Sequence, residues 1–246
     1  MKDISYKRHR FPPEVIEHAV WLYFRFTMSL RDVEDLLAER GIDVSYETVR
    51  CWNRKFGLAI SRNLRRLQGK ADTVWHADEM GIKIGSKRLG FGMIPRIIRR
   101  LRYMWRALDK EGVVLDAIVQ KRRNKAAALK LLKKLLKRQG FVPDKFVTDG
   151  LTSYKAAMKE LGCQARHALG RLRENNRAES SHLPVRRRER KMQRFKSQGH
   201  ARLFISTYSA VYNNFNIDRH LTSRNTMRYL RNAAMEEWKI ASGPAG

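Results

Sequence analysis

Apolar residues recur at helical spacing in three successive stretches of residues 12–57. The first stretch begins at Pro12-Pro13-Glu14, and proline in a first helical turn loses no intrahelical hydrogen bond. Ser29 and Ser45 can cap the two helices that follow, and Gly41 ends the first of these. Two such helices are typical of a helix-turn-helix, although a plain three-helix bundle has the same pattern. In a helix-turn-helix the last helix enters the major groove, and it would present Tyr46, Arg50 and Arg54 to DNA.

The alternation typical of strands replaces helical spacing after about residue 73. It predicts strands at Thr73–Ile84, Tyr103–Asp109 and Val113–Gln120, with a hairpin between the last two. Between the first two strands, residues 88–100 contain Pro95 and two glycines, which disfavour a continuous strand. This insertion is interpreted either as a basic hairpin loop that contacts DNA or as scar sequence in a decaying gene copy.

Helices and short strands alternate in the rest of the chain. Residues 124–139 carry an apolar stripe with lysines opposite, which predicts a helix with a solvated face. A strand at 145–148, a helix at 153–161, a fifth strand at 164–168 and helices from about residue 176 follow. This order predicts a mixed α/β fold of the ribonuclease-H-like kind, with a five-stranded mixed sheet flanked by helices.

The changes of pattern along the chain also predict its domains. Residues 1–60 form the helix-turn-helix domain, and residues 61–72 form a basic linker because they show no strong apolar face. Residues 73–215 form the ribonuclease-H-like catalytic domain, and residues 216–246 form a C-terminal helical tail.

The charge of the chain points to a polyanionic partner. Lys and Arg number 52 against 24 Asp and Glu, a formal net charge of +28, which is typical of proteins that bind nucleic acid. A ribosomal or other RNA-binding protein would share this charge. Apolar stretches are too short to cross a membrane, and the basic N-terminus lacks the apolar region of a secretory signal. The chain is therefore expected to be cytoplasmic, with no membrane partner.

Three acids are the candidates for chemistry. Asp78 and Asp149 each end an apolar run, and Glu179 lies on a predicted helix. An aspartate among apolar strand residues is costly unless it is paired or bound to metal. Three carboxylates could hold two Mg²⁺ ions, although Asp78 could instead face solvent and Asp149 could begin a turn with Gly150. Glu79 adjoins Asp78 but points to the opposite strand face, so it ranks behind Asp78 as a ligand.

Several motifs together resemble a known family over about residues 10–214: Trp75–Glu79, Tyr103–Asp109, Val147–Asp149, Ser153-Tyr154 and Asn175–Glu179. They are similar to those of bacterial transposases of the insertion-sequence-six family. The resemblance implies an acidic-triad (DDE) transposase with an integrase-like core, in which Asp78, Asp149 and Glu179 are the catalytic and metal-binding residues. It implies two Mg²⁺ ions, with Mn²⁺ able to substitute.

The same resemblance implies the reaction and the partners. Such enzymes bind the terminal inverted repeats of their element, cut the DNA to free a 3′-hydroxyl and join that hydroxyl to target DNA. They act as homo-oligomers, and a bacterial member would work at the nucleoid in the cytoplasm.

Basic residues surround the third acid in the sequence. Arg177 and His182 flank Glu179 and either contact DNA phosphate or serve in helix packing. A basic run is usually a solvated face, but this one is next to the presumed site, which favours phosphate contacts. The residues of the run are Arg186, Arg187, Arg188 and Arg190.

Some features depart from the family pattern. The 88–100 insertion is one, and Gly150 stands where many relatives carry lysine after the second acid. The spacing of 29 residues between Asp149 and Glu179 is also shorter than is usual. The alternative hypothesis is therefore a catalytically inactive, decayed transposase that acts only as a DNA-binding protein or repressor.

Overall fold

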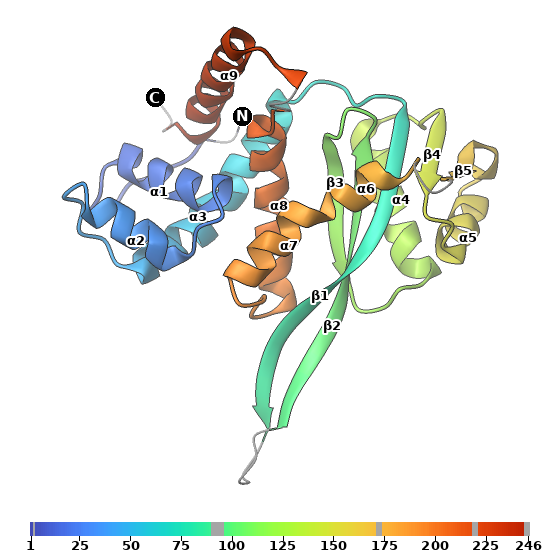
Figure 1. Cartoon of the computed structure of the whole chain (residues 1–246), viewed down its shortest axis with the longest axis horizontal. Coiled ribbons are helices and arrows are strands. Elements are labelled where there is room, and N and C mark those ends of the chain that lie inside the picture. Colours follow the sequence, from blue (N-terminus) through green and yellow to red (C-terminus); the bar gives the residue numbers. More distant parts are fainter. Residues whose placement is uncertain (2, 90–95, 171–173, 218–220, 244–246) are drawn as a thin grey trace. The chain divides into compact units, whose positions relative to one another are not determined.

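The computed structural model describes residues 1, 3–89, 96–170, 174–217 and 221–243, with the backbone alone for 86–89 and 96–100. The chain divides into two compact units (Figure 1). The first unit comprises Met1–Gly69 and Ser206–Gly246, and the second comprises Lys70–Ile205.

The first unit contains the helices that the N-terminal pattern predicts. They are α1 at Pro13–Arg25, α2 at Leu30–Ala38 and α3 at Tyr46–Leu67. The hydroxyl of Ser29 accepts a hydrogen bond from the Asp32 backbone N–H at 3.1 Å, and the Asp32 carboxylate accepts one from the Ser29 N–H at 3.0 Å. This reciprocal pair is a capping box, so the sequence signal that predicted the start of α2 is present in the structure.

The predicted linker at 61–72 is wrong for residues 61–67, which are the last turns of α3, although the boundary between the two units does fall within it, after Gly69. Ser61, Asn63 and Leu64 are buried there, and the Asn63 amide donates to the Ala241 carbonyl at 3.0 Å. Two of these three buried positions are polar side chains. The segment therefore shows little apolar periodicity in sequence although one of its faces is covered.

Residues 216–246 are not a separate tail, because their helix packs on the N-terminal helices. Helix α9 spans Arg224–Ser242, and α8 spans Gln198–Phe215. Trp238 of α9 is buried, and the Tyr6 hydroxyl donates to the Ser242 carbonyl at 2.7 Å. The predicted boundary at residue 215 therefore differs from the observed division of the chain.

The second unit is built on a five-stranded mixed sheet in the order β3-β2-β1-β4-β5 among the described residues. Strands β1, β2 and β3 are antiparallel, and β4 and β5 run parallel to β1. This arrangement confirms the predicted mixed α/β, ribonuclease-H-like fold. The strands are β1 Val74–Leu89, β2 Arg96–Asp109, β3 Val114–Gln120, β4 Lys145–Thr148 and β5 His167–Leu169. The other elements are α4 Lys125–Gln139, α5 Thr152–Glu160, the 3₁₀ turn Gln164–Arg166, α6 Asn176–Ser180 and α7 His182–Lys191.

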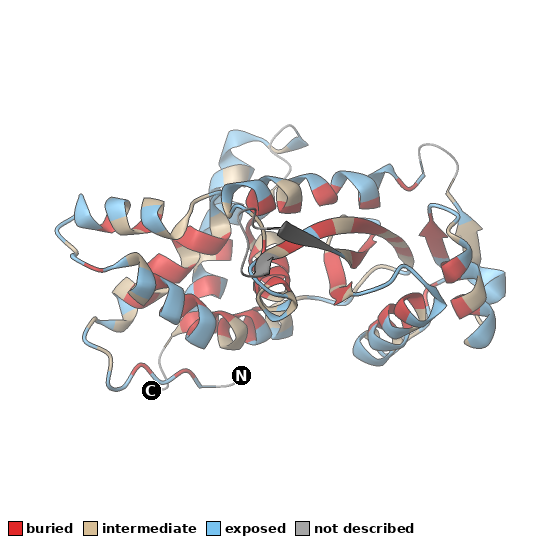
Figure 2. Cartoon of the chain, turned by 90° about the horizontal axis from the view of Figure 1, so that it is seen from below, coloured by how far each residue is buried: buried red, intermediate tan, exposed pale blue. Residues whose placement is uncertain are grey.

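The core of this unit lies between the sheet and helices α4 and α5. Trp75 and Trp105 are fully buried, and the ring of Trp105 meets that of Tyr154 edge-on at 5.3 Å. The buried positions of Figure 2 follow the strands and the inner sides of the helices that cover them. The wide apolar stripe of α4 is thus satisfied by packing on the strands.

The first two strands are longer than the sequence pattern predicts. Strand β1 continues to Leu89 and pairs there with Arg96 of β2, after a register irregularity between Ile84 and Ser86. The two ends of the 88–100 insertion therefore belong to two antiparallel strands, which agrees with the expectation that the insertion is not one continuous strand. Antiparallel pairing satisfies the backbone hydrogen-bonding groups of each strand, whichever side chains the strand carries. Pro95 and the two glycines, on which that expectation rested, lie outside the described residues.

We expect Leu131→Ala to destabilise this unit by about 2–5 kcal/mol, because Leu131 is fully buried under the sheet and its removal leaves a cavity. Its neighbour Lys130 is exposed, so Lys130→Ala should stay within about 0.5 kcal/mol of the wild type. Denaturant titration of the two variants checks the difference. Equal stabilities would contradict the assignment of this helix face to the core.

Candidate active site

Strand pairing brings the first two predicted acids together. Strands β1 and β4 are parallel, and Ala77 pairs with Thr148 as the last matched residues. Asp78 and Asp149 are the next residues of the two strands, so they lie side by side at the point where β4 ends and β1 continues. The Asp78 side chain is 13% exposed, whereas that of Asp149 is 34% exposed.

Asp149 is oriented by the turn that it begins. Its Oδ1 accepts a hydrogen bond from the Leu151 N–H at 3.1 Å, and the Thr148 hydroxyl accepts one from the Gly150 N–H at 3.3 Å. The φ of Gly150 is +88°, a conformation that glycine adopts without strain and other residues rarely adopt. Glycine after the second acid therefore fits this turn, although relatives were expected to carry lysine there.

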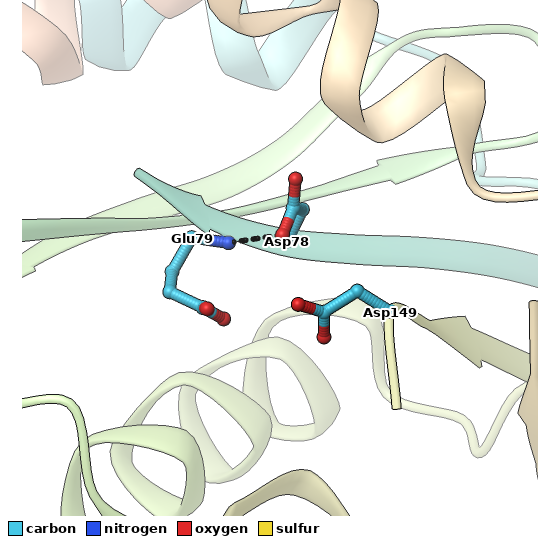
Figure 3. A group of neighbouring side chains, drawn as sticks. All are labelled: Asp78, Glu79 and Asp149. Atoms are coloured by element: carbon cyan, nitrogen blue, oxygen red, sulfur yellow. Dashed lines mark hydrogen bonds between the residues drawn. The ribbon is translucent and has the colours of Figure 1, made fainter. Parts of the chain in front are cut away.

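Glu79 joins the two aspartates in one acidic cluster. Oxygen atoms of Asp78, Glu79 and Asp149 all lie within 4.8 Å of one another. Figure 3 shows that Asp78 and Glu79 leave opposite sides of β1, as predicted, and that Asp149 reaches toward the strand from the end of β4. Asp149 lies beyond the last pair of the two strands, so its carboxylate can approach both faces.

Arg123 holds this cluster from the loop after β3. Its guanidinium forms an ion pair with Glu79, whose side chain is only 1% exposed, and lies 3.4 Å from Asp149 Oδ2. Sequence reasoning missed Arg123 and ranked Glu79 low. The available signal was a basic residue directly before the Asn124 cap of α4, at the sheet edge where β4 also ends.

Burial and like charges raise the pKa values of Asp78 and Glu79. Desolvation, together with the neighbouring carboxylates Asp149 and Glu179, raises the pKa of Asp78 to about 6. Desolvation also raises the pKa of Glu79 to about 7, with Asp149 adding to the rise and Arg123 opposing it. Perturbed carboxylates grouped in this way are a feature of functional sites.

Glu179 lies next to this cluster rather than within it. It is exposed on α6, a short helix placed against β1 by the Asn175 amide, which donates to the Ala77 carbonyl at 3.3 Å. The charge of Glu179 contributes to the raised pKa of Asp78, so the two carboxylates are near neighbours. Of the predicted trio, the structure thus groups Asp78 with Asp149 and leaves Glu179 beside them.

His182 is a buried neighbour of the first acid. Its Nδ1 lies 3.6 Å from Asp78 Oδ2, which is too far for a hydrogen bond. Desolvation, together with the charges of Arg106 and Arg186, lowers the pKa of His182 to about 3, so the imidazole is neutral at pH 7. Packing is therefore its main observed role, and a direct contact with a DNA backbone would require it to be exposed.

The predicted DNA-binding arginines divide by exposure. Arg177, Arg187 and Arg190 are exposed, and Arg186 is half-buried beside Glu189. Arg188 is only 1% exposed, with its guanidinium 5.2 Å from the centre of the Phe204 ring. The prediction that Arg188 contacts DNA is wrong, because a helix turns by about 100° per residue and this position faces the core.

The three predicted groove-reading residues lie in the other unit, on α3. Arg50 and Arg54 are exposed, and Tyr46 is half-buried. Arg50 forms an ion pair with Glu47, and the guanidinium of Arg31 lies 5.2 Å from the centre of the Tyr46 ring. These positions are compatible with the predicted role in DNA binding, which stays a prediction.

The cluster fits a divalent cation. Its ligands are carboxylate oxygens, the hard donors that Mg²⁺ requires, and their mutual repulsion would be relieved by a positive ion. Glu79 Oε2 is buried and has no hydrogen-bond partner among the described residues. Unpaired carboxylate oxygen of this kind is what an ion between the three side chains would satisfy.

A ribonuclease-H-like sheet with grouped carboxylates where β1 passes the end of β4 defines a protein of the metal-dependent nuclease and transposase class. Residues 94–218, just over half of the chain, match a family described as a DDE domain. The chain belongs to this family, and its resemblance to insertion-sequence transposases is confirmed. The matched residues include Asp149 and Glu179, whereas Asp78 precedes them.

Curated relatives are transposases of Staphylococcus aureus. The transposase for insertion sequence-like element IS431mec is 33% identical over 159 residues, which are 64% of this chain and 65% of the relative. The transposase for insertion sequence element IS257 in transposon Tn4003 is 32% identical over the same length. The match therefore spans slightly less than two thirds of these relatives.

Among solved structures, the Mos1 strand transfer complex aligns with 98% of this chain and 80% of that chain, at 13% identity and a TM-score of 0.40. A pre-cleavage Mos1 transpososome aligns with a TM-score of 0.36 at 15% identity. Likenesses at this level add nothing to the family assignment. The family and the acidic cluster together support the use of a divalent metal. Within the described residues, no helix is both long and apolar enough to span a bilayer.

The raised pKa of Asp78 predicts a pH-dependent stability. Because folding raises this pKa from 3.8 to about 6, the stabilising contribution of the protonated carboxyl is complete below pH 3.8. It is lost as the pH rises through about 6. Without metal, the stability of the wild type relative to Asp78→Asn should therefore fall over this window. Urea titrations at a series of pH values measure it, and a rise with pH would contradict the assigned desolvation.

Proposed function

We propose that this protein is a DNA transposase that cuts the ends of an insertion sequence and joins them to target DNA. The observation that carries the proposal is the placement of Asp78 beside Asp149, at the end of β4, in a chain of the DDE-domain family. Its DNA substrates would be the terminal inverted repeats of the element and the target site. The protein would act at the nucleoid in the bacterial cytoplasm.

Asp78, Asp149 and Glu179 are the proposed catalytic residues and would hold two Mg²⁺ ions, for which Mn²⁺ can substitute. When bound, two such metal ions activate an attacking oxygen and stabilise the charge on a leaving oxygen. The role of Arg123 is to hold Glu79 and orient Asp149, since it contacts both. The neutral His182 and the start of α6 shield Asp78 from water on the side of β1 opposite to Glu79.

The reaction consists of two phosphoryl transfers. In the first, water attacks the phosphodiester at the element end, the bond to the 3′-oxygen breaks, and a 3′-hydroxyl and a 5′-phosphate result. In the second, that 3′-hydroxyl attacks a phosphodiester of the target and releases a target 3′-hydroxyl. Each step breaks one ester bond and forms one bond to phosphorus, so no oxidant or energy source is needed.

DNA would be held by basic groups of both units. Tyr46, Arg50 and Arg54 on α3 would read the terminal repeat as part of a helix-turn-helix domain, and Arg177, Arg186, Arg187 and Arg190 would contact phosphate. The domain assignments are part of the proposal, with 1–69 and 206–246 as the DNA-reading unit. A homo-oligomer would bring two element ends together.

The test is an assay of the purified protein with Mg²⁺ and a labelled duplex that carries an inverted repeat flanking the coding region. We expect cleavage at the repeat end and joining of the freed strand to a second duplex. Tight binding of the repeat with no metal-dependent product would instead support an inactive transposase that acts as a DNA-binding protein or repressor. Preference for RNA of matched length over the repeat would contradict both.

A further inference from the structure

A basic cavity of about 680 Å³ lies beside β1, five residues beyond Asp78. Its walls come from β1, from α7 and from the turn that follows α7. The lining residues are Lys83, Arg186, Glu189, Arg190, Gln193 and Arg194.

Hydrogen bonds fix the wall where the turn meets β1. The Glu189 carboxylate accepts from the Lys83 N–H at 2.6 Å, and the Phe195 carbonyl accepts from the Gly85 N–H at 2.7 Å. A Cβ on Gly85 would lie 2.6 Å from the Lys196 carbonyl oxygen, closer than atoms can approach. Only glycine allows the turn to contact the strand here, so the cavity has a rigid, defined wall.

The charge of the cavity is strongly unbalanced. Four of its six lining residues are cationic, and its one acid, Glu189, accepts bonds from the Lys83 N–H and from Arg186 at 3.3 Å. Within the described part of the chain, no carboxylate is in ion-pair range of the side chains of Lys83, Arg190 or Arg194. A hollow surface with unpaired cations concentrates positive potential and attracts anions.

The lining residues differ from those of an ordinary small-molecule site. Pockets of this volume that bind organic ligands are lined mainly by apolar and aromatic groups, whereas every side chain here is charged or polar. Arginine forks and lysine suit phosphate oxygens. The chemistry therefore favours a phosphate-containing polyanion.

The cavity and the acids lie along the same edge of β1. Strand β2 covers one edge over the whole strand, and the other edge carries β4 at Val74–Ala77 and the Phe195 contact at Ile84. Asp78 and Lys83 are about 17 Å apart along the strand, at about 3.3 Å per residue. That distance is longer than the spacing of adjacent phosphates on one DNA strand, so a contact at Lys83 would be to a different phosphate from the one at the acids.

We propose that this cavity binds the phosphodiester backbone of DNA at a second position, about 17 Å along β1 from the acids. The placement relative to the acids rests on the proposed function. The contact itself is independent of base sequence, and it adds Lys83 and Arg194 to the residues that position DNA.

The test compares two variants of the full chain that lose the same charge. The cavity variant, Lys83→Gln with Arg190→Gln, removes two exposed cationic side chains from the cavity wall. The control variant, Lys130→Gln with Lys137→Gln, removes two exposed lysines of α4. Binding of a mixed-sequence duplex is followed by fluorescence anisotropy between about 50 and 200 mM salt. The plot of log affinity against log salt should become shallower by about two for the cavity variant and stay unchanged for the control. Thermal unfolding establishes that both variants fold.

A second readout locates the contact on DNA. Neutral methylphosphonates placed one at a time along a strand should weaken wild-type binding at a position where the cavity variant is insensitive. Equal salt slopes for the two variants would overturn the proposal, as would a changed oligomer mass with an unchanged slope, which would indicate a second protein copy in the cavity. These experiments measure binding and not cleavage. A protein that binds DNA but does not cut it would therefore refute the proposed function without contradicting the cavity contact.

Discussion

Asp149→Asn is expected to reduce metal-dependent strand cleavage by at least about a thousandfold, or ~4 kcal/mol in activation free energy. An oxygen of Asp149 lies within 4.8 Å of oxygens of both Asp78 and Glu79, which leave opposite sides of β1. Asparagine has the same shape, and its oxygen can still accept the Leu151 N–H that holds the turn. The substitution therefore removes a negative ligand while it preserves the local fold.

The comparison requires a control for charge and for binding. Asp144→Asn makes the same change at an exposed carboxylate, whose nearest cation, Arg166, is 3.6 Å away, and it should leave cleavage within about twofold of the wild type. Repeat-end binding should be equal for both variants in single-turnover experiments with the labelled duplex. Cleavage by Asp149→Asn within tenfold of the wild type would show that this acid is not part of the catalytic centre.

Glu179→Gln is expected to have the second largest effect, a loss of cleavage of about a hundredfold or more. The structure makes this variant the sharper test, because two glutamates compete for the position of third ligand. Glu79 lies within the cluster, but it is buried and paired with Arg123. Glu179 is exposed beside Asp78, where a carboxylate is free to turn toward a bound ion.

Glu174→Gln is the matched control, since Glu174 is an exposed glutamate before the same helix and is 3.7 Å from Lys145. We expect Glu179→Gln to need more Mg²⁺ for half-maximal cleavage, with no change in unfolding temperature without metal. Glu79→Gln should instead leave the Mg²⁺ requirement unchanged, because Glu79 is buried and already paired with Arg123. Full activity of Glu179→Gln with loss in Glu79→Gln would move the third-ligand role to Glu79.

The sequence predicted the positions of Asp78 and Asp149 in the sheet better than it predicted which basic residues are exposed. Asp78 and Asp149 follow apolar runs that form neighbouring strands, and parallel neighbours end at the same edge, so their proximity could be anticipated. Arg188 was wrongly grouped with its neighbours because a continuous basic run does not reveal which of its positions faces the core. The aromatic ring that covers it belongs to Phe204, on the next helix.

Local periodicity by itself determined the mixed α/β class, the main strands and the helices of residues 12–57, and the charge predicted a polyanionic partner. These features depend on neighbours within a few residues, which the sequence displays directly. Only the tertiary structure decided that α3 extends through residue 67 under α9, that Arg123 joins Glu79 to Asp149, and that a basic cavity lies along β1. Each of these depends on contacts between distant segments, where polar side chains are buried or aligned by pairing that no local pattern records.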